Sequence, residues 1–195
     1  MGVFEGNAAE TARKIAYATA ATLAYRLTIW YNFTAYSIKK GLTIMRITFN
    51  AIGTVQNKAE RQKDTGWGAT LSHIVIDPVY EQGLCGLSDF SHIVVVYYLD
   101  KARFDTTKHL VRRPQGRADM PKIGIFSQRA KDRPNPIGIT AVKLVDIQNN
   151  VITVQGLDAI HGTPVLDIKP YYPMYDCKPD ATVPAWVNIL MKDYF

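Results

Sequence analysis

Short runs of apolar or alternating residues recur along the chain from Met45 onward. Six of these runs have the length and the content of β-branched residues that are typical of strands. They are residues 47–55, 70–77, 91–99, 122–126, 138–147 and 151–157. Asn149 and Asn150 separate the last two and predict a hairpin, because asparagine tolerates the positive φ of such turns. Strands and helices do not alternate regularly, so the pattern predicts a mainly β fold, a small closed or strongly bent β-barrel.

Both ends of the chain have a different pattern. Residues 1–44 are rich in alanine and threonine with helix-like spacing. We treat them as an N-terminal extension, helical or disordered or the product of an upstream start codon, to a domain of residues 45–195. The uncharged stretches of this extension are shorter than the roughly 20 residues needed to cross a bilayer. Near the other end, Pro184 predicts the start of a short C-terminal helix. Three of its apolar residues would share one face, namely Trp186, Ile189 and Leu190.

The composition predicts one domain without metal or disulfide chemistry. A chain of 195 residues with 47% hydrophobic content can bury one sizeable core. Cys85 and Cys177 are far apart, and neither they nor the four histidines have ligand spacing. This argues against a disulfide scaffold and a zinc site, and it is typical of a cytoplasmic protein.

Positive charge is concentrated in one stretch. The net charge is +6, and residues 101–133 hold ten basic and three acidic residues, a local balance of +7. The basic residues are Lys101, Arg103, Lys108, Arg112, Arg113, Arg117, Lys122, Arg129, Lys131 and Arg133. Such a stretch suits a polyanionic partner such as RNA or DNA, and a solvated loop is the alternative.

The run RPNPIG, residues 133–138, is an unusual candidate for a functional site. Each proline restricts its own φ and keeps the preceding residue out of the helical region, which predicts that Arg133 and Asn135 are extended and point the same way. Gly138 would allow a close approach of the backbone or an unusual φ. The run therefore presents one guanidinium and one amide, or it is a rigid turn that caps neighbouring backbone groups.

A second candidate lies between Pro164 and Pro170, where the segment is predicted to be extended. Asp167 and Lys169 then share one face of it. The pair can act on a substrate, or it can be a structural ion pair. The sequence has no GxGxxG or GxxxxGK[ST] phosphate-binding motif.

Several motifs together resemble the TrmO/TsaA-like (YaeB) family. They are IGIFSQRAKDRPNPIGIT, LDAIHGTPVLDIKPYYPMYD, AIGTV and GLSDFSHIVVVYYL, in the order that the family has them and within about residues 46–190. The resemblance implies a small β-barrel, a homodimer, and an S-adenosyl-L-methionine-dependent tRNA methyltransferase. The implied reaction methylates the N6 nitrogen of N6-threonylcarbamoyladenosine beside the anticodon of threonine tRNA.

The resemblance also implies roles for individual residues. Those that would bind the cofactor are Asp100, Lys101, Arg129, Ile139, Gln155, Gly156, Leu157 and Asp158. We expect Arg129 to bind the methionine carboxylate or a phosphate, and Asp158 to accept a hydrogen bond from a cofactor hydroxyl or amine. The candidate catalytic residues, which would handle the substrate, are Arg133, Asn135, Asp167 and Lys169.

The chain departs from the family pattern in three respects. His161 stands where an aspartate is usual, and residues 64–68 (DTGWG) stand in place of an Arg-Gln-Pro element. There is also no room for the C-terminal domain of the longer bacterial members. Two alternatives follow: a methyltransferase for another nucleoside or a small molecule, and a non-catalytic barrel that binds a nucleotide or RNA.

Overall fold

The computed structural model describes residues 45–195. Residues Ala51–Phe195 form one compact unit, and all described helices and strands lie within it. The predicted extension of residues 1–44 lies outside the described residues. No helix of the described part is long and apolar enough to cross a membrane.

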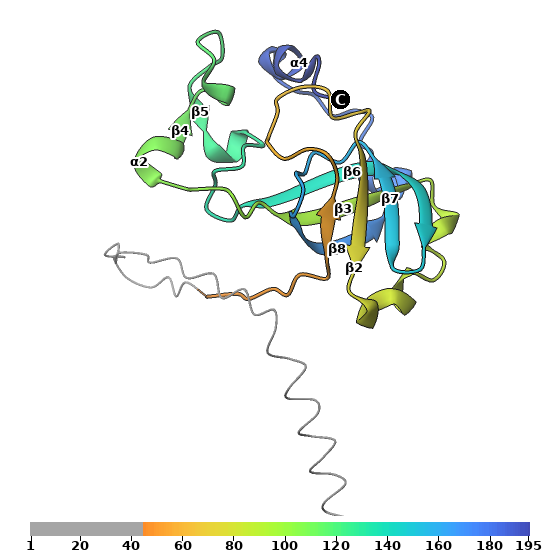
Figure 1. Cartoon of the computed structure of the whole chain (residues 1–195). Coiled ribbons are helices and arrows are strands. Elements are labelled where there is room, and N and C mark those ends of the chain that lie inside the picture. The colour runs from red at the N-terminus through yellow and green to blue at the C-terminus, as the bar shows by residue number, and fades with distance from the viewer. Residues whose placement is uncertain (1–44) are drawn as a thin grey trace, which may run out of the picture. The chain divides into compact units, whose positions relative to one another are not determined.

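Six antiparallel strands close into a barrel in the order β1-β2-β7-β6-β3-β8 (Figure 1). The strands are β1 (Gly53–Gln56), β2 (Leu71–Ile76), β3 (His92–Tyr98), β6 (Ile137–Gln148), β7 (Val151–Gln155) and β8 (Pro164–Pro170). The barrel that the sequence predicts is confirmed. The β6–β7 hairpin is confirmed as well, and Asn149 at its turn has a φ of 53°.

The core lies inside the barrel, where alternate residues of each strand point. In β3 these are Ile93, Val95 and Tyr97, all at most 3% exposed. Val142 of β6 and Val165 of β8 pack into the same cluster. The alternation read from the sequence therefore fixes which side of each strand is buried.

Two of the predicted strands are corrected. The first begins only at Gly53, whereas residues 45–52 have no strand structure. Of residues 122–126, only β5 (Ile123–Gly124) is a strand, and it pairs with β4 (Val111–Arg112) in a separate two-stranded sheet. The chain then turns into a short 3-10 helix, η5 (Ile125–Ser127), in which Phe126 is 79% exposed. The apolar pattern of residues 122–126 does not make them a barrel strand, because no strand of the barrel lies beside them. Their one partner strand among the described residues is β4.

Residues 100–135, between β3 and β6, form an excursion that we call the arm. It carries β4, β5, η5, α2 (Thr106–His109) and the 3-10 helix η4 (Pro114–Gly116). Figure 1 shows these elements in green, standing apart from the barrel strands. Two hydrogen bonds close its base: Leu99 N donates to Pro136 O at 2.8 Å, and Arg103 N donates to Asp132 Oδ1 at 2.9 Å.

The remaining elements are short helices. They are the 3-10 helices η2 (Pro78–Leu84) and η3 (Leu87–Asp89), and α3 (Pro173–Asp176) and α4 (Ala185–Met191). Helix α4 confirms the predicted C-terminal helix, with Pro184 as its N-cap residue. Trp186 and Leu190 are half-buried, but Ile189 is exposed, so the expected three-residue face is reduced to two.

Candidate functional site

The carboxylate of Asp158, just after β7, is the centre of a hydrogen-bonded cluster. The Tyr97 hydroxyl donates to Asp158 Oδ1 at 2.7 Å, and the Thr140 hydroxyl donates to the same oxygen. The Tyr194 hydroxyl donates to Oδ2 at 2.7 Å. Since an ionised carboxylate has about four acceptor positions, one position on Oδ2 stays available for an N–H or O–H donor.

Three successive residues of β6 lie at this end of the barrel and contact the cluster or Arg129. Gly138 lies opposite Tyr97, and a Cβ at this position would come within 2.2 Å of the tyrosine ring. A glycine is therefore required for the ring to pass and for its hydroxyl to reach Asp158. The carbonyl of Ile139 accepts a hydrogen bond from Arg129 Nη2, and Thr140 contacts Asp158. The close backbone approach predicted at Gly138 is confirmed.

Both tyrosines of the cluster remain neutral hydrogen-bond donors. Burial raises the pKa of Tyr97, and the negative charge of Asp158 raises it further. Burial also raises the pKa of Tyr194, again with a contribution from Asp158. Because the two phenols stay protonated well above neutral pH, Asp158 keeps both donors over the physiological range.

The segment predicted to hold a cofactor, Gln155 to Asp158, is fixed by its own contacts. Gln155 Nε2 donates to Gly68 O at 3.1 Å, and Gly156 N donates to Thr70 O at 2.9 Å. Gly156 has a φ of 93°, a conformation that favours glycine. Leu157 is fully buried in the barrel core, so its side chain shapes the turn and does not face a ligand.

Asp100 and Lys101, which the resemblance assigns to cofactor binding, lie beside Asp158. Their side chains form an ion pair with an N–O distance of 2.7 Å. With Asp158 they line a narrow cleft of about 10 Å³, the space of roughly one water molecule. The other lining residues are Gln62, Leu99, Ala159, Ile160 and Thr163.

Arg129 lies at the same end of the barrel. Its positive charge and the negative charge of Asp64 both act on the Tyr194 phenol. One of its five N–H donors is used by Ile139 O, and the side chain is exposed. Arg129 can therefore bind an anionic group at this end of the barrel.

The RPNP run differs from its predicted conformation. Residues 131–135 form a succession of bends and not a straight extended segment. Arg133 is half-buried, with Nη1 donating to Gln128 O at 3.4 Å, whereas Asn135 is exposed. The prolines stiffen the run, but its bends give the two side chains different surroundings.

Asp167 and Lys169 form an ion pair on the outside of the barrel. Their N–O distance is 2.7 Å, and both side chains are about half exposed or more. Asp167 pairs in register with Val96, whose neighbours Val95 and Tyr97 face the core, so Asp167 points outward. This geometry supports the alternative reading of a structural ion pair, away from the inward-facing Asp158 cluster.

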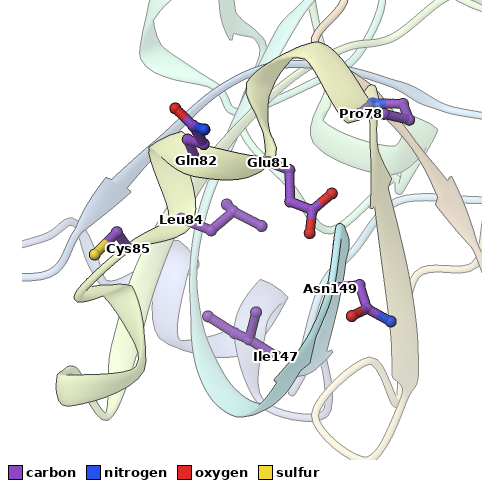
Figure 2. A pocket seen from close by; sticks show the side chains of 7 residues that line it. All are labelled: Pro78, Glu81, Gln82, Leu84, Cys85, Ile147 and Asn149. Carbon is purple, nitrogen blue, oxygen red and sulfur yellow. The ribbon is translucent and has the colours of Figure 1, made fainter.

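A larger pocket, of about 540 Å³, lies at the other end of the β2–β7 pair (Figure 2). It is lined by Pro78, Glu81, Gln82, Leu84, Cys85, Ile147 and Asn149. None of the residues predicted to bind cofactor or substrate lines it. Although its volume suits a small molecule, its lining has one carboxylate and no cationic group, which makes it a poor match for the predicted chemistry.

His161, a residue that departs from the family pattern, accepts a backbone hydrogen bond. Its Nδ1 accepts from Asn57 N at 3.4 Å, and Asn57 Nδ2 donates to Ala159 O at 2.8 Å. Asn57 therefore links His161 to the turn after Asp158. Within residues 45–195 there is no group of three or more acidic, histidine or cysteine side chains that could hold a metal ion.

Sequence reasoning missed three members of the cluster: Tyr97, Thr140 and Tyr194. A tyrosine on the buried side of β3 needs a hydrogen-bond partner, and Thr140 lies on the buried side of the neighbouring strand, so these two left a signal. Nothing in the sequence pattern indicates the role of Tyr194, because its contact with Asp158 depends on the tertiary fold.

The comparisons with known proteins agree with this architecture. The family model of the tRNA-methyltransferase O N-terminal domain matches residues 54–177. A probable S-adenosyl-L-methionine-binding protein of Pyrococcus abyssi is 33% identical over 149 residues, which cover 74% of this chain and 78% of that protein. The human tRNA (adenine(37)-N6)-methyltransferase is 41% identical over 104 residues, 53% of this chain but 23% of the human protein.

A solved structure has the same fold. TrmO from Pseudomonas aeruginosa matches with a TM-score of 0.61 and 25% identity, covering 75% of this chain and 64% of that one. The chain thus spans less than two thirds of that structure and about a quarter of the human relative. Residues 54–177, which the family model matches, contain Asp158, Tyr97, Thr140 and the arm. The chain belongs to the family of the tRNA-methyltransferase O N-terminal domain.

Proposed function

We propose that this protein is an S-adenosyl-L-methionine-dependent methyltransferase that acts on the N6 nitrogen of an adenine in tRNA. The observation that carries the proposal is the Asp158 cluster, with an acceptor position on Oδ2 that no described residue occupies and with the exposed guanidinium of Arg129 at the same end of the barrel. The names of the relatives support S-adenosyl-L-methionine as cofactor and tRNA as substrate.

The residues at this end of the barrel fit the cofactor chemically. S-adenosyl-L-methionine carries hydroxyl and amine donors, which suit the acceptor position on Asp158 Oδ2. It also carries a carboxylate, which suits the unused donors of Arg129. Asp100 is a further carboxylate beside Asp158, and it can offset positive charge.

The chemistry that the cofactor supplies is a methyl group on a positively charged sulfur. The protein's own contribution is alignment, which can supply on the order of 7 to 11 kcal/mol in favourable cases. Tyr97 and Thr140 hold Asp158 from the barrel wall, and Gln155 and Gly156 fix the turn before it. These contacts are partly buried or involve the backbone, so the binding surface is already ordered before a ligand binds. Binding then loses less conformational entropy.

The arm is the proposed binding surface for tRNA. Several of its basic residues lie in ion pairs at the surface, such as Lys108 with Asp105 at 3.7 Å and Arg117 with Asp119 at 2.7 Å. These exposed pairs are weak enough to exchange for phosphate contacts. The proposed substrate nucleoside is N6-threonylcarbamoyladenosine, whose carboxylate suits the guanidinium of Arg133. The exposed amide of Asn135 is a second candidate contact for the substrate.

We also propose that the protein is a cytoplasmic homodimer. The cleft beside Asp158 is too narrow for a whole cofactor, so a second copy can supply further walls. The arm exposes the apolar side chains of Leu110, Val111 and Phe126, which a second copy can cover. Light scattering after size-exclusion chromatography should give twice the chain mass of 21.9 kDa.

Two experiments test the function. Isothermal calorimetry with S-adenosyl-L-methionine should give stoichiometric binding, and an absence of binding would favour the non-catalytic barrel instead.

Mass spectrometry of tRNA nucleosides from cells with and without the gene should then reveal a methylated N6-threonylcarbamoyladenosine that depends on the gene. If deletion of the gene instead removes a methyl group from another nucleoside or a small molecule, that molecule is the substrate, and the proposed cofactor is unaffected.

A further inference from the structure

We propose that residues 193–195 form a strap that completes the cofactor site, with Tyr194 as a positioning residue for Asp158. Tyr194 contributes the one hydrogen bond that reaches Asp158 Oδ2 among the described residues. The inference rests on the proposed function, because it assigns the strap to the binding of the same cofactor. The family model ends at residue 177, so the strap lies outside the matched region.

The strap is held by its backbone. Gly66 N donates to Asp193 O at 2.9 Å, and Trp67 N donates to Tyr194 O at 2.8 Å. These donors belong to residues 64–68, the loop that stands in place of the family's Arg-Gln-Pro element. Trp67 is 2% exposed, and its Nε1 donates to Lys63 O at 3.0 Å, so the loop is itself anchored in the fold.

Gly68 is shaped to receive the strap. A Cβ on Gly68 would lie 2.6 Å from the carbonyl carbon of Phe195, a distance that side chains do not tolerate. Its φ is not in the left-handed region, so space and not backbone conformation requires the glycine. The loop sequence is therefore fitted to a docked strap.

The contacts favour a strap that completes the site over one that blocks it. Tyr194 occupies one acceptor position of Oδ2, and the second remains for a ligand donor. With Tyr97 and Thr140 on Oδ1, both oxygens of Asp158 are fixed in direction. A fixed carboxylate does not have to be ordered when the ligand binds, so Tyr194 should strengthen binding.

The first test is Tyr194→Phe in the full chain. It removes the hydroxyl and keeps the ring, which stacks edge-on with Phe195 at 4.9 Å. Calorimetry should give a dissociation constant for S-adenosyl-L-methionine about tenfold higher than that of the unchanged protein. In steady-state assays KM for the cofactor should rise, while kcat and KM for tRNA stay constant. The matched control is Tyr175→Phe, at an exposed position in α3, which should leave all of these unchanged.

The second test displaces the strap without touching Tyr194. Gly68→Ala should reproduce the loss of affinity, whereas Gly83→Ala should not, because nothing lies within 4 Å of a Cβ at Gly83. Because both changes remove the same contact, the double variant with Tyr194→Phe should bind about as weakly as either single variant. Losses that multiply would show that Gly68 acts through another contact, such as the one from Gln155.

The outcomes separate the inference from the proposed function. No binding by the unchanged protein overturns both. Binding by the unchanged protein with an unaltered Tyr194→Phe variant overturns the inference alone. Tighter binding by Tyr194→Phe also overturns it, because it would show that the strap occupies the ligand's place.

Discussion

The barrel end around Asp158 and the arm hold their polar groups in opposite ways. At the barrel end, three hydroxyl groups converge on one carboxylate, and the strands beneath them are buried. In the arm, arginines and lysines pair with exposed aspartates, as Arg117 does with Asp119 at 2.7 Å and Lys108 with Asp105 at 3.7 Å. Hydrogen bonding to Arg117 lowers the pKa of Asp119, which stays charged and solvated.

This difference suggests a division of work. Buried hydrogen bonds are expensive to break and keep a fixed geometry, which suits the alignment that a methyl transfer needs. Exposed ion pairs are worth about 0 to 1 kcal/mol each and respond to salt, which suits a surface that exchanges them for phosphates. We therefore expect changes at the barrel end to alter cofactor binding, and changes in the arm to alter tRNA binding.

The largest effect is expected from Asp158→Ala. It leaves three hydroxyl donors without their acceptor and removes the proposed ligand contact, so affinity for S-adenosyl-L-methionine should fall about 100-fold. Calorimetry checks this, with Asp180→Ala, an exposed carboxylate, as the matched control. An affinity that survives the loss of Asp158 would locate the cofactor away from the barrel end.

Gly138→Ala should disturb the same site through packing. The added methyl collides with the Tyr97 ring, and such overpacking costs about 1 to 3 kcal/mol of unfolding free energy. Urea unfolding measures that loss, and calorimetry should detect weaker cofactor binding. Gly124→Ala in the arm is the control, since the nearest atom to its Cβ would be Leu110 O at 4.0 Å. If Gly138→Ala and Gly124→Ala lowered stability and cofactor affinity equally, the proposed difference between the barrel end and the arm would be wrong.

The raised pKa of Tyr97 predicts a loss of stability in alkali. The unfolded chain releases this phenol's proton above about pH 10, whereas the folded protein retains it. The free energy of unfolding should therefore fall by about 1.4 kcal/mol per pH unit above pH 10 on account of Tyr97 alone. Unfolding in urea at several pH values measures the slope, and Tyr97→Phe should remove this part of it.

A smaller effect is expected from Lys122→Ala in the arm. Among the described residues Lys122 has no hydrogen bond or ion pair, so it is available to a phosphate. Its loss should lower the slope of log tRNA affinity against log salt by about 0.7 to 0.9 and leave cofactor affinity unchanged. Filter binding at several salt concentrations measures the slope. An unchanged slope would remove Lys122 from the tRNA surface.

The smallest effect is expected from Asp167→Asn. An exposed ion pair contributes less than about 1 kcal/mol, and the pair lies on the outer face of the barrel. Thermal unfolding and methylation assays should both give values close to those of the unchanged protein. A large fall in kcat would instead restore the catalytic interpretation of this pair.

Much of the fold could be predicted from the sequence, because strand alternation and the Asn149–Asn150 turn are local signals. The cluster was predicted only in part. Asp158 and Arg129 came from the resemblance, and the close approach at Gly138 came from the residue type. That the approaching group is the Tyr97 ring depends on the register of β3 and β6, which local patterns do not give.

The errors have physical causes too. Residues 122–126 have the composition of a strand, but only two of them find a partner, since the arm leaves the barrel. Arg133 and Asn135 were expected to be extended because of the two prolines, yet the segment bends between them. Tyr194 lies 36 residues from Asp158 in sequence, and its contact depends on the packing of residues 64–68 against the strap.

The most direct test is a crystal structure of the full chain with S-adenosyl-L-methionine bound. We predict a hydroxyl or amine of the cofactor within hydrogen-bond distance of Asp158 Oδ2, with Tyr97, Thr140 and Tyr194 still donating to the carboxylate. Cofactor bound instead in the pocket between Pro78 and Asn149 would contradict the account (Figure 2).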